Sequence, residues 1–348
     1  MLGDRPTLPR PGDWTAATLP PGWHRSLTGA EVDELDRALA TFRRAHPSLD
    51  PGLVGDDDFP LPGLAAELAE LRRELVDGTG VVAWSGFPVD RYGEDELRAL
   101  WWGLARAVGT PVSQSWRGDL IGDVEDLGTG ITGRTGRGYT SSGELSFHAD
   151  ASDVSGLFFL RTAREGGVNR MASAVATHDE IARRRPDLLE ELYRPLPWSW
   201  QGNQPAGERG WYEMPVFGRR GDDVSCAYVR TNILLAAENA GAPPLTDRQR
   251  EAVQLVADVA AEPGRWVERT FAPGSMLWVH NHTVLHLRTA FVDYDEPERK
   301  RHLLRVWVSP PNNRPLPESF GSFFGDVAAG AVRGGYRPRH DRPVYRTV

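Results

Sequence analysis

Two short segments of the sequence carry residues that could hold a metal ion. The first contains His148 and Asp150, which are separated by one residue. In an extended chain residues i and i+2 point to the same side, so this imidazole and this carboxylate can meet at one point. The second segment carries three histidines behind an apolar run, at His280, His282 and His286. A His-x-Asp pair alone is frequent by chance, and it is the second group that favours a metal site.

Two histidines and one carboxylate leave coordination positions open, which suits an iron(II) ion that must also bind a co-substrate and dioxygen. A structural zinc site would need four protein ligands, usually including cysteine, and the chain has a single cysteine, Cys226. Spacing does not decide which of the three histidines is the ligand. A cupin-type hydrolase or isomerase could use the same triad with zinc or manganese, and a jelly-roll binding protein that has lost its metal is a third interpretation.

The elements that must position these segments can be predicted from periodicity. Helical spacing of apolar residues, with Thr28 as a possible cap, predicts helices near residues 29–42, 64–75, 94–108, 177–193 and 246–260. Short β-type runs between glycine and proline turns predict strands near 81–84, 156–160, 224–229, 266–271, 276–279 and 303–308. Helices followed by a long β-rich body indicate an α+β domain built on a barrel or jelly roll.

At the metal-binding segments the sequence resembles the taurine dioxygenase (TauD/TfdA) family of iron(II)- and 2-oxoglutarate-dependent dioxygenases. The shared motifs are F-H-x-D at residues 147–150, L-H-x-R-T at 285–289 and R-H-L-L-R-x-W at 301–307. The resemblance implies that His286 is the third metal ligand. It also implies a distorted double-stranded β-helix (jelly roll, cupin-like) with flanking and inserted helices. The sequence departs from the family pattern at His280, where asparagine is usual.

The resemblance also implies a site for 2-oxoglutarate. Arg301 and Arg305 follow the third ligand on a β-type run and lie four residues apart, so they should point to the same side. The planar guanidinium of arginine matches the distal carboxylate of this co-substrate. By resemblance Arg305 is its main partner and Arg301 assists, although a generic basic patch is the alternative. Asn169 stands where the family usually has threonine or serine, and its amide can also donate to a carboxylate.

The implied reaction is the oxidation of an unactivated C–H bond in a small molecule, by hydroxylation, desaturation or cyclisation, with iron(II), 2-oxoglutarate and dioxygen. Glu144 and Gln114 stand where taurine dioxygenase contacts its substrate; a surface glutamate and a turn glutamine are the alternatives. Trp200 belongs to an aromatic group, with Trp198, Trp211 and Tyr212, that could form a lid or fill the core. We expect an amino-acid-derived or secondary-metabolite substrate.

The composition limits the partners of the chain. A net charge of −8 argues against a general affinity for nucleic acid. The single cysteine suits a reducing compartment, and no stretch approaches the roughly 20 apolar residues of a membrane helix, so we expect a cytoplasmic protein. We also expect one domain over residues 1–348, with residues 1–25 as an extension containing proline and tryptophan that packs on the body.

Overall fold

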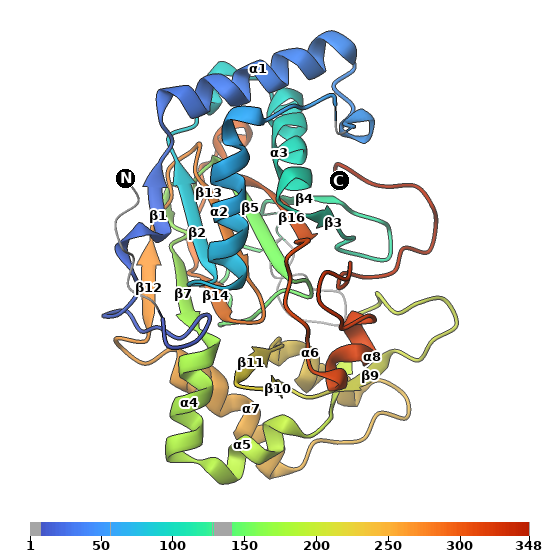
Figure 1. Ribbon diagram of the computed structural model, residues 1–348. Helices are drawn as coiled ribbons and strands as arrows, with labels where there is room; N and C mark the ends of the chain where they lie inside the picture. The colour runs from blue at the N-terminus through green and yellow to red at the C-terminus, as the bar shows by residue number, and fades with distance from the viewer. Residues whose placement is uncertain (1–7, 56, 127, 129–140, 348) are drawn as a thin grey trace.

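The centre of the computed structural model is a seven-strand sheet (Figure 1). The structure describes residues 8–55, 57–126, 128 and 141–347, so residues 1–7 of the expected N-terminal extension lie outside the described residues. The strands run in the order β1 (His24–Ser26), β2 (Val81–Ser85), β13 (Met276–His280), β5 (Val154–Arg161), β16 (His302–Ser309) and β3 (Thr110–Pro111), with β4 (Ile121–Val124) also paired to β16. A three-strand sheet consists of β12 (Trp266–Arg269), β7 (Asn169–Ser173) and β14 (Val284–Arg288).

Side chains from both sheets meet in one buried cluster. Alternation along β13 shows how this arises: Leu277 and Val279 join the cluster that also holds Met171 and Val284 of the smaller sheet. The intervening Trp278 faces the helices on the other side of the large sheet. Two facing sheets with helices added outside confirm the predicted α+β fold of the double-stranded β-helix type.

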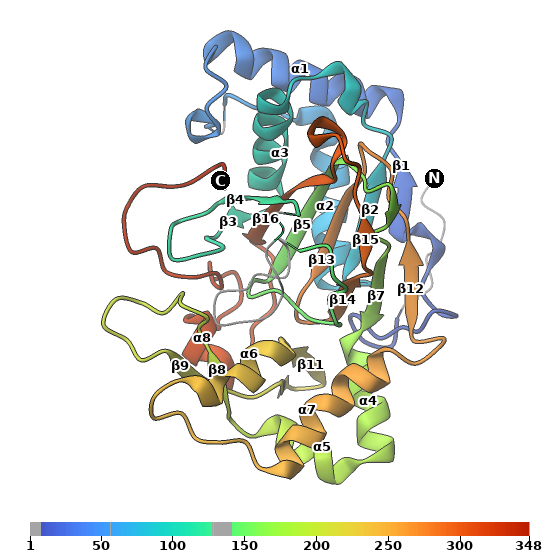
Figure 2. The same cartoon turned by 180° about the vertical axis from the view of Figure 1, so that it is seen from behind.

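Two of the three N-terminal helices pack on the outer face of the large sheet, and the first of the three packs on the third (Figures 1 and 2). The three helices are α1 (Gly29–Ala45), α2 (Ala65–Val76) and α3 (Glu94–Val108). The predicted cap is present, because Thr28 and Glu31 form a capping box at the start of α1. Trp101 of α3 packs on Trp278 with ring centroids 4.7 Å apart. Gly156 permits this approach, since a Cβ there would lie 2.4 Å from the Trp278 ring.

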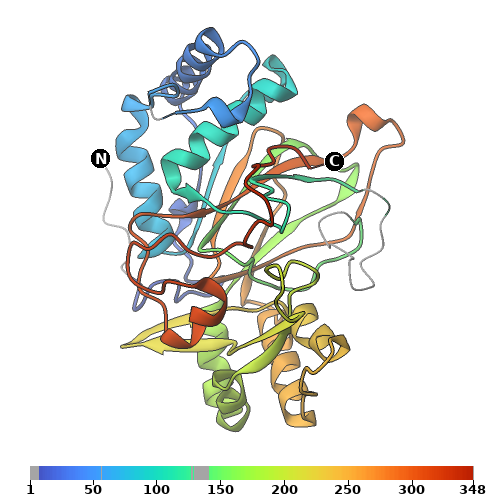
Figure 3. The same cartoon turned by 90° about the vertical axis from the view of Figure 1, so that its right-hand side faces the viewer.

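A second lobe packs below the sheets and is seen from the side in Figure 3. Its helices are α4 (Ala174–Arg184), α5 (Pro186–Tyr193), α6 (Arg230–Leu234), α7 (Asp247–Ala260) and α8 (Gly321–Phe324), and its strand pairs are β8 (Leu196–Ser199) with β9 (Trp211–Met214) and β10 (Phe217–Arg220) with β11 (Asp223–Cys226). The predicted helix at 177–193 is two helices, because Pro186 forces Arg185 out of helical geometry. No helix within the described ranges is long and apolar enough to cross a membrane.

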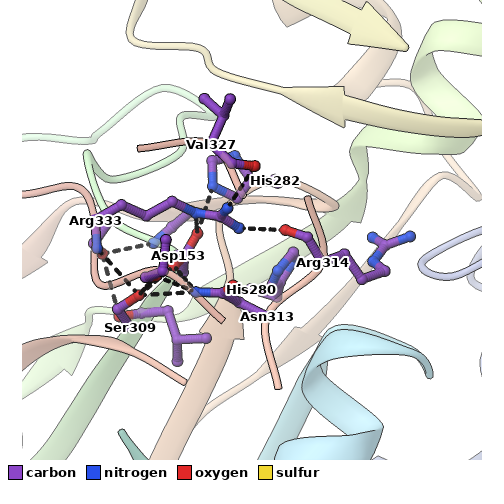
Figure 4. A network of polar contacts seen from close by, with 12 residues as sticks. Asp153, His280, His282, Ser309, Asn313, Arg314, Val327 and Arg333 are labelled. Carbon is purple, nitrogen blue, oxygen red and sulfur yellow. Dashed lines mark hydrogen bonds and ion pairs between the residues drawn. The ribbon is translucent and has the colours of Figure 1, made fainter. Parts of the chain in front are cut away.

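A buried carboxylate, Asp153, ties the C-terminal segment to the large sheet (Figure 4). Its Oδ1 accepts from Arg333 Nε at 2.8 Å and lies 3.0 Å from His282 Nε2. Its Oδ2 accepts from Ser309 Oγ at 2.7 Å and from Asn313 Nδ2 at 3.0 Å. Burial alone would raise the pKa of Asp153, but the hydrogen bonds and the nearby positive charge hold this pKa at about 2. The carboxylate therefore stays ionised inside the protein.

This anchor places the residues after Arg333 beside the segment that follows the first metal-binding motif. Gly334 forms a β-bridge with Ser152, and Gly335 N–H donates to the Ala151 carbonyl at 2.6 Å. Both glycines have positive φ, and a Cβ on either would lie 3.0 Å or less from backbone atoms of neighbouring segments. The chain is thus set close against its neighbours immediately before Tyr336.

We predict that Arg333→Met lowers the free energy of unfolding by about 3–5 kcal/mol, because it leaves a buried charge without its ionic partner. Urea unfolding followed by circular dichroism measures this change. Arg346→Met is the matched control, since Arg346 belongs to the same segment but is 52% exposed in its pair with Asp95; its effect should stay below about 1 kcal/mol. Equal losses in the two variants would contradict this role of Arg333.

Candidate active site

Two backbone hydrogen bonds join the segments that carry the expected metal ligands. The N–H of His148 donates to the carbonyl of His286 at 3.0 Å, and the N–H of His286 donates to the carbonyl of His148 at 2.8 Å. The two imidazole centroids lie 4.4 Å apart. Ligand atoms of His148, Asp150 and His286 all lie within 4.8 Å of one another. The structure therefore gathers the three residues at one point, at the end of the space between the sheets.

Neighbouring groups orient two of these side chains. Asp150 Oδ2 accepts from Ser155 Oγ at 2.6 Å and from Trp307 Nε1 at 3.2 Å. His148 Nδ1 lies 2.9 Å from the carbonyl of Ser146. Because a carbonyl only accepts, Nδ1 must carry the proton, and Nε2 is left with the lone pair that a metal needs.

The charges around the triad favour the protonation states required for metal binding. Burial would raise the pKa of Asp150, but the guanidinium of Arg305, together with the hydrogen bond from Ser155, lowers this pKa below its ordinary range. Burial, followed by the neighbouring His148, lowers the pKa of His286. An ionised carboxylate beside a neutral imidazole is the state that coordinates a divalent metal.

The other two histidines of the second motif have different partners. His282 Nε2 lies 3.0 Å from Asp153, and its Nδ1 lies 3.2 Å from the carbonyl of Cys226. His280 Nδ1 lies 3.0 Å from Thr283 Oγ1. Both imidazoles are buried in the hydrogen-bonded interior. The geometry thus places His286 with the triad, a choice that spacing alone left open.

Gln114 holds Arg305 beside the triad. Arg305 Nε donates to Gln114 Oε1 at 2.7 Å, while Gln114 Nε2 donates to the carbonyl of Arg305 at 2.9 Å and to that of Leu120 at 3.2 Å. Arg305 Nη1 then lies 3.7 Å from Asp150 Oδ1. Gln114 was expected to contact the substrate; it lines the cavity beside the triad, so this contact stays a prediction, and its hydrogen bonds also position Arg305.

Arg301 lies elsewhere in the interior and is 5% exposed. Its guanidinium is 5.1 Å from the ring of Phe291, which Arg288 also approaches, at 4.6 Å. Burial, followed by the charge of Arg288, lowers the pKa of Arg301 to about 9. Asn169 pairs with Arg288 in the β7–β14 ladder, and its buried Nδ2 has no hydrogen-bond partner. No residue that the structure describes supplies an acceptor to the Arg301 guanidinium either.

A cavity of about 230 Å³ opens beside the triad. Glu144, which is solvent-exposed, lines it as expected for a substrate contact. Sequence reasoning missed several polar and aromatic residues of its wall: Gln201, Asn203, Arg230, Asn232 and Tyr336. They stand singly in loops or at element ends, where no periodicity or motif marks them.

Trp200 lines a neighbouring cavity, of about 950 Å³, which shares Tyr336 with the first. Its ring packs against Tyr212 at 4.4 Å and Phe323 at 5.4 Å. The structure therefore does not place Trp200 in the wall of the cavity beside the triad. Trp198, Trp211 and Tyr212 are buried in the β8–β9 hairpin. The burial of these three rings favours the core alternative, and closure of this segment over the site stays a prediction.

Residues 24–307 match the family described as "Taurine catabolism dioxygenase TauD, TfdA family". The chain belongs to this family. FR-33289 synthase of Streptomyces rubellomurinus is 28% identical over 279 residues, which cover 78% of this chain and 81% of that protein. The taurine hydroxylase-like protein SAT17 of Stachybotrys chartarum is 27% identical over 304 residues, covering 82% and 77%.

Solved structures share the TauD/TfdA fold. An asparagine oxygenase in complex with iron(II), hydroxyasparagine and succinate is 19% identical, with a TM-score of 0.61 over 82% of this chain and 93% of that one. The non-haem iron oxygenase OrfP with iron, succinate and hydroxyarginine is 17% identical, with a TM-score of 0.62 over 82% and 94%. Family membership confirms that the chain is a dioxygenase of the class that uses iron(II), 2-oxoglutarate and dioxygen.

For this TauD/TfdA member we predict that His148→Ala, Asp150→Ala and His286→Ala each abolish iron(II) binding, because each removes one of three ligands. Anaerobic calorimetric titration with iron(II) measures the effect on protein shown to be folded. His282→Gln is the control: it weakens the Asp153 network but should still bind one equivalent of iron. Loss of iron in His282→Gln together with its retention in His286→Ala would refute the ligand assignment.

Proposed function

We propose that this protein oxidises an unactivated C–H bond of a small amino-acid-derived or secondary-metabolite substrate, with hydroxylation as the expected outcome. The observation that carries the proposal is the His148, Asp150 and His286 cluster beside a small cavity. The relatives support it, since the asparagine oxygenase and OrfP structures hold hydroxylated amino acids. The alternative of a metal-dependent hydrolase or isomerase finds no support in the match to a dioxygenase family.

The residues present fit the metal and the co-substrate. His148, Asp150 and His286 would hold iron(II), with Ser155 and Trp307 keeping the carboxylate in place. When bound, iron(II) and 2-oxoglutarate supply the activation of dioxygen, which no amino-acid side chain can provide. The protein supplies the cavity beside these residues, whose walls orient the substrate.

For 2-oxoglutarate we propose that Arg301 and Asn169 bind the distal carboxylate. Asn169 has a buried Nδ2 donor without an acceptor, and Arg301 is a buried cation. Asn169 lies two residues from Met171, the ladder partner of His286, and so shares the face of that ligand. Two residues along a strand span about 7 Å, a distance suited to the carbon chain of 2-oxoglutarate. Arg301 lies beside the same segment, since its Nε is 3.7 Å from the position of a Cβ on Gly167.

Arg305 suits the metal end of the co-substrate or the substrate. Its Nη1 is 3.7 Å from Asp150, and Gln114 occupies its Nε. An arginine so close to a metal ligand is badly placed for the far carboxylate of a molecule that chelates the metal at its other end. The resemblance implied that Arg305 is the main partner of the distal carboxylate and that Arg301 assists. The proposal assigns the main role to Arg301 instead, because the resemblance carried no information on the burial or partners of either arginine.

Succinate formation tests the proposed function. The protein supplied with iron(II), 2-oxoglutarate and air should convert 2-oxoglutarate to succinate slowly without substrate, and faster with asparagine-like or arginine-like amino acids that gain one oxygen atom by mass spectrometry. Asp150→Ala should form none. Metal-dependent turnover of such compounds with zinc or manganese and without 2-oxoglutarate would contradict the proposal.

We predict that Arg301→Met weakens 2-oxoglutarate binding about 10- to 150-fold, because a charged hydrogen bond contributes about 1.5–3 kcal/mol and each decade of affinity is about 1.4 kcal/mol. Calorimetric titration under argon measures this. The same substitution should leave the ligand-free protein about as stable as the wild type, since burial and the charge of Arg288 both disfavour this cation. Arg305→Met is the comparison, and it should weaken the binding of 2-oxoglutarate less than Arg301→Met does. An unchanged affinity for 2-oxoglutarate in Arg301→Met would contradict the assignment of Arg301 to the distal carboxylate.

A further inference from the structure

We infer that the substrate carries an oxyanion group, a carboxylate or a phosphonate, and that Arg230 binds this group. The inference rests on the proposed function, because it concerns the substrate of the same site. Arg230 is the first residue of α6 and lines the cavity that His148, Asp150 and Arg305 also line. A side chain that the second lobe contributes thus faces the same space as the metal ligands.

Arg230 lacks a partner in the described part of the chain. Its Nε is shielded from solvent and has no hydrogen-bond acceptor, and no carboxylate there forms an ion pair with its guanidinium. Asn232, two residues later, has a shielded Oδ1 that is also without a partner and lines the same cavity. Leaving such shielded polar groups unpaired is unfavourable. A ligand that supplies the missing partners would recover this free energy.

The charges of the cavity favour an anion at Arg230. Asp150 is committed to the metal, and Glu144, the other carboxylate of the described wall, is exposed to solvent. Arg305 already donates to Gln114 and lies near Asp150. Among the residues that the structure describes, no carboxylate therefore pairs with the positive charge of Arg230. The guanidinium fork binds carboxylates and phosphorus oxyanions through two parallel hydrogen bonds, which makes these groups its natural ligands.

The size of the cavity limits the rest of the substrate. Its volume of about 230 Å³ lies below the usual range for drug-sized ligands, about 300–1,000 Å³. Once an anionic end is bound at Arg230, little space remains before the metal triad. Gln201 and Asn203 contribute neutral polar groups to the wall of the same cavity. The substrate class is therefore a small molecule with one oxyanion end and a C–H bond a few atoms away.

Matched acid and neutral probes test the inference on the full-length protein with iron(II) and 2-oxoglutarate under argon. The probes are N-acetyl amino acids against their amides, and alkylphosphonates against their dimethyl esters, with affinities from calorimetry and from the change in the visible absorbance of the iron complex. The wild type should prefer the acid of at least one pair by about 10- to 150-fold, the effect of a charged hydrogen bond. Which pair responds separates a carboxylate from a phosphonate substrate.

Arg230→Met should remove the preference, Arg230→Lys should keep part of it, and Arg250→Met, on the exposed face of α7, should keep all of it. Circular dichroism establishes that each variant is folded. If Arg230→Met does not fold, Arg230→Gln takes its place. A wild type that binds no acid better than its neutral partner, or a preference that survives in Arg230→Met, overturns the inference. Failure of the wild type to bind iron and 2-oxoglutarate contradicts the proposed function instead. In that case calorimetry with the same probes, without iron and 2-oxoglutarate, still tests whether Arg230 binds an anion.

Discussion

The pair of backbone hydrogen bonds between His148 and His286 is the constraint on which the site depends. These residues are 138 positions apart in sequence (286 − 148), yet each donates its N–H to the carbonyl of the other. A backbone pair of this kind fixes both Cα positions, so the two imidazoles face one point without further adjustment. Asp150, two residues from His148, completes the cluster through the alternation of an extended chain.

The rest of the fold maintains this junction from both sides. The seven-strand and three-strand sheets pack face to face, and each carries one side of the junction to the edge of their common core. Asp153 then uses its buried charge to bring Arg333 and the C-terminal segment against the same strands. The walls of the cavity therefore come from segments far apart in the chain. The hydrogen-bond network around the ionised Asp153 holds these segments in fixed positions relative to one another.

The sequence predicted the parts of this structure that depend on local pattern. Residues 94–108 form the expected helix because their apolar residues keep helical spacing throughout. The ligand types were recognisable because His148 and Asp150 are close in sequence, whereas His286 required a family resemblance. Alternation placed Arg301 and Arg305 on one side but could not show which is buried without a partner. Arg230 gave no signal, because one arginine at the start of a five-residue helix belongs to no pattern.

The central claim is that the triad presents one iron(II) ion to chelating 2-oxoglutarate. Visible absorbance of the protein with both ligands under argon tests it most directly, since a bidentate complex of iron(II) with a 2-oxo acid produces a weak metal-to-ligand charge-transfer band. The account predicts this band in the wild type and its absence in Asp150→Ala. The lack of any band in folded wild-type protein at saturating iron(II) and 2-oxoglutarate would contradict the account.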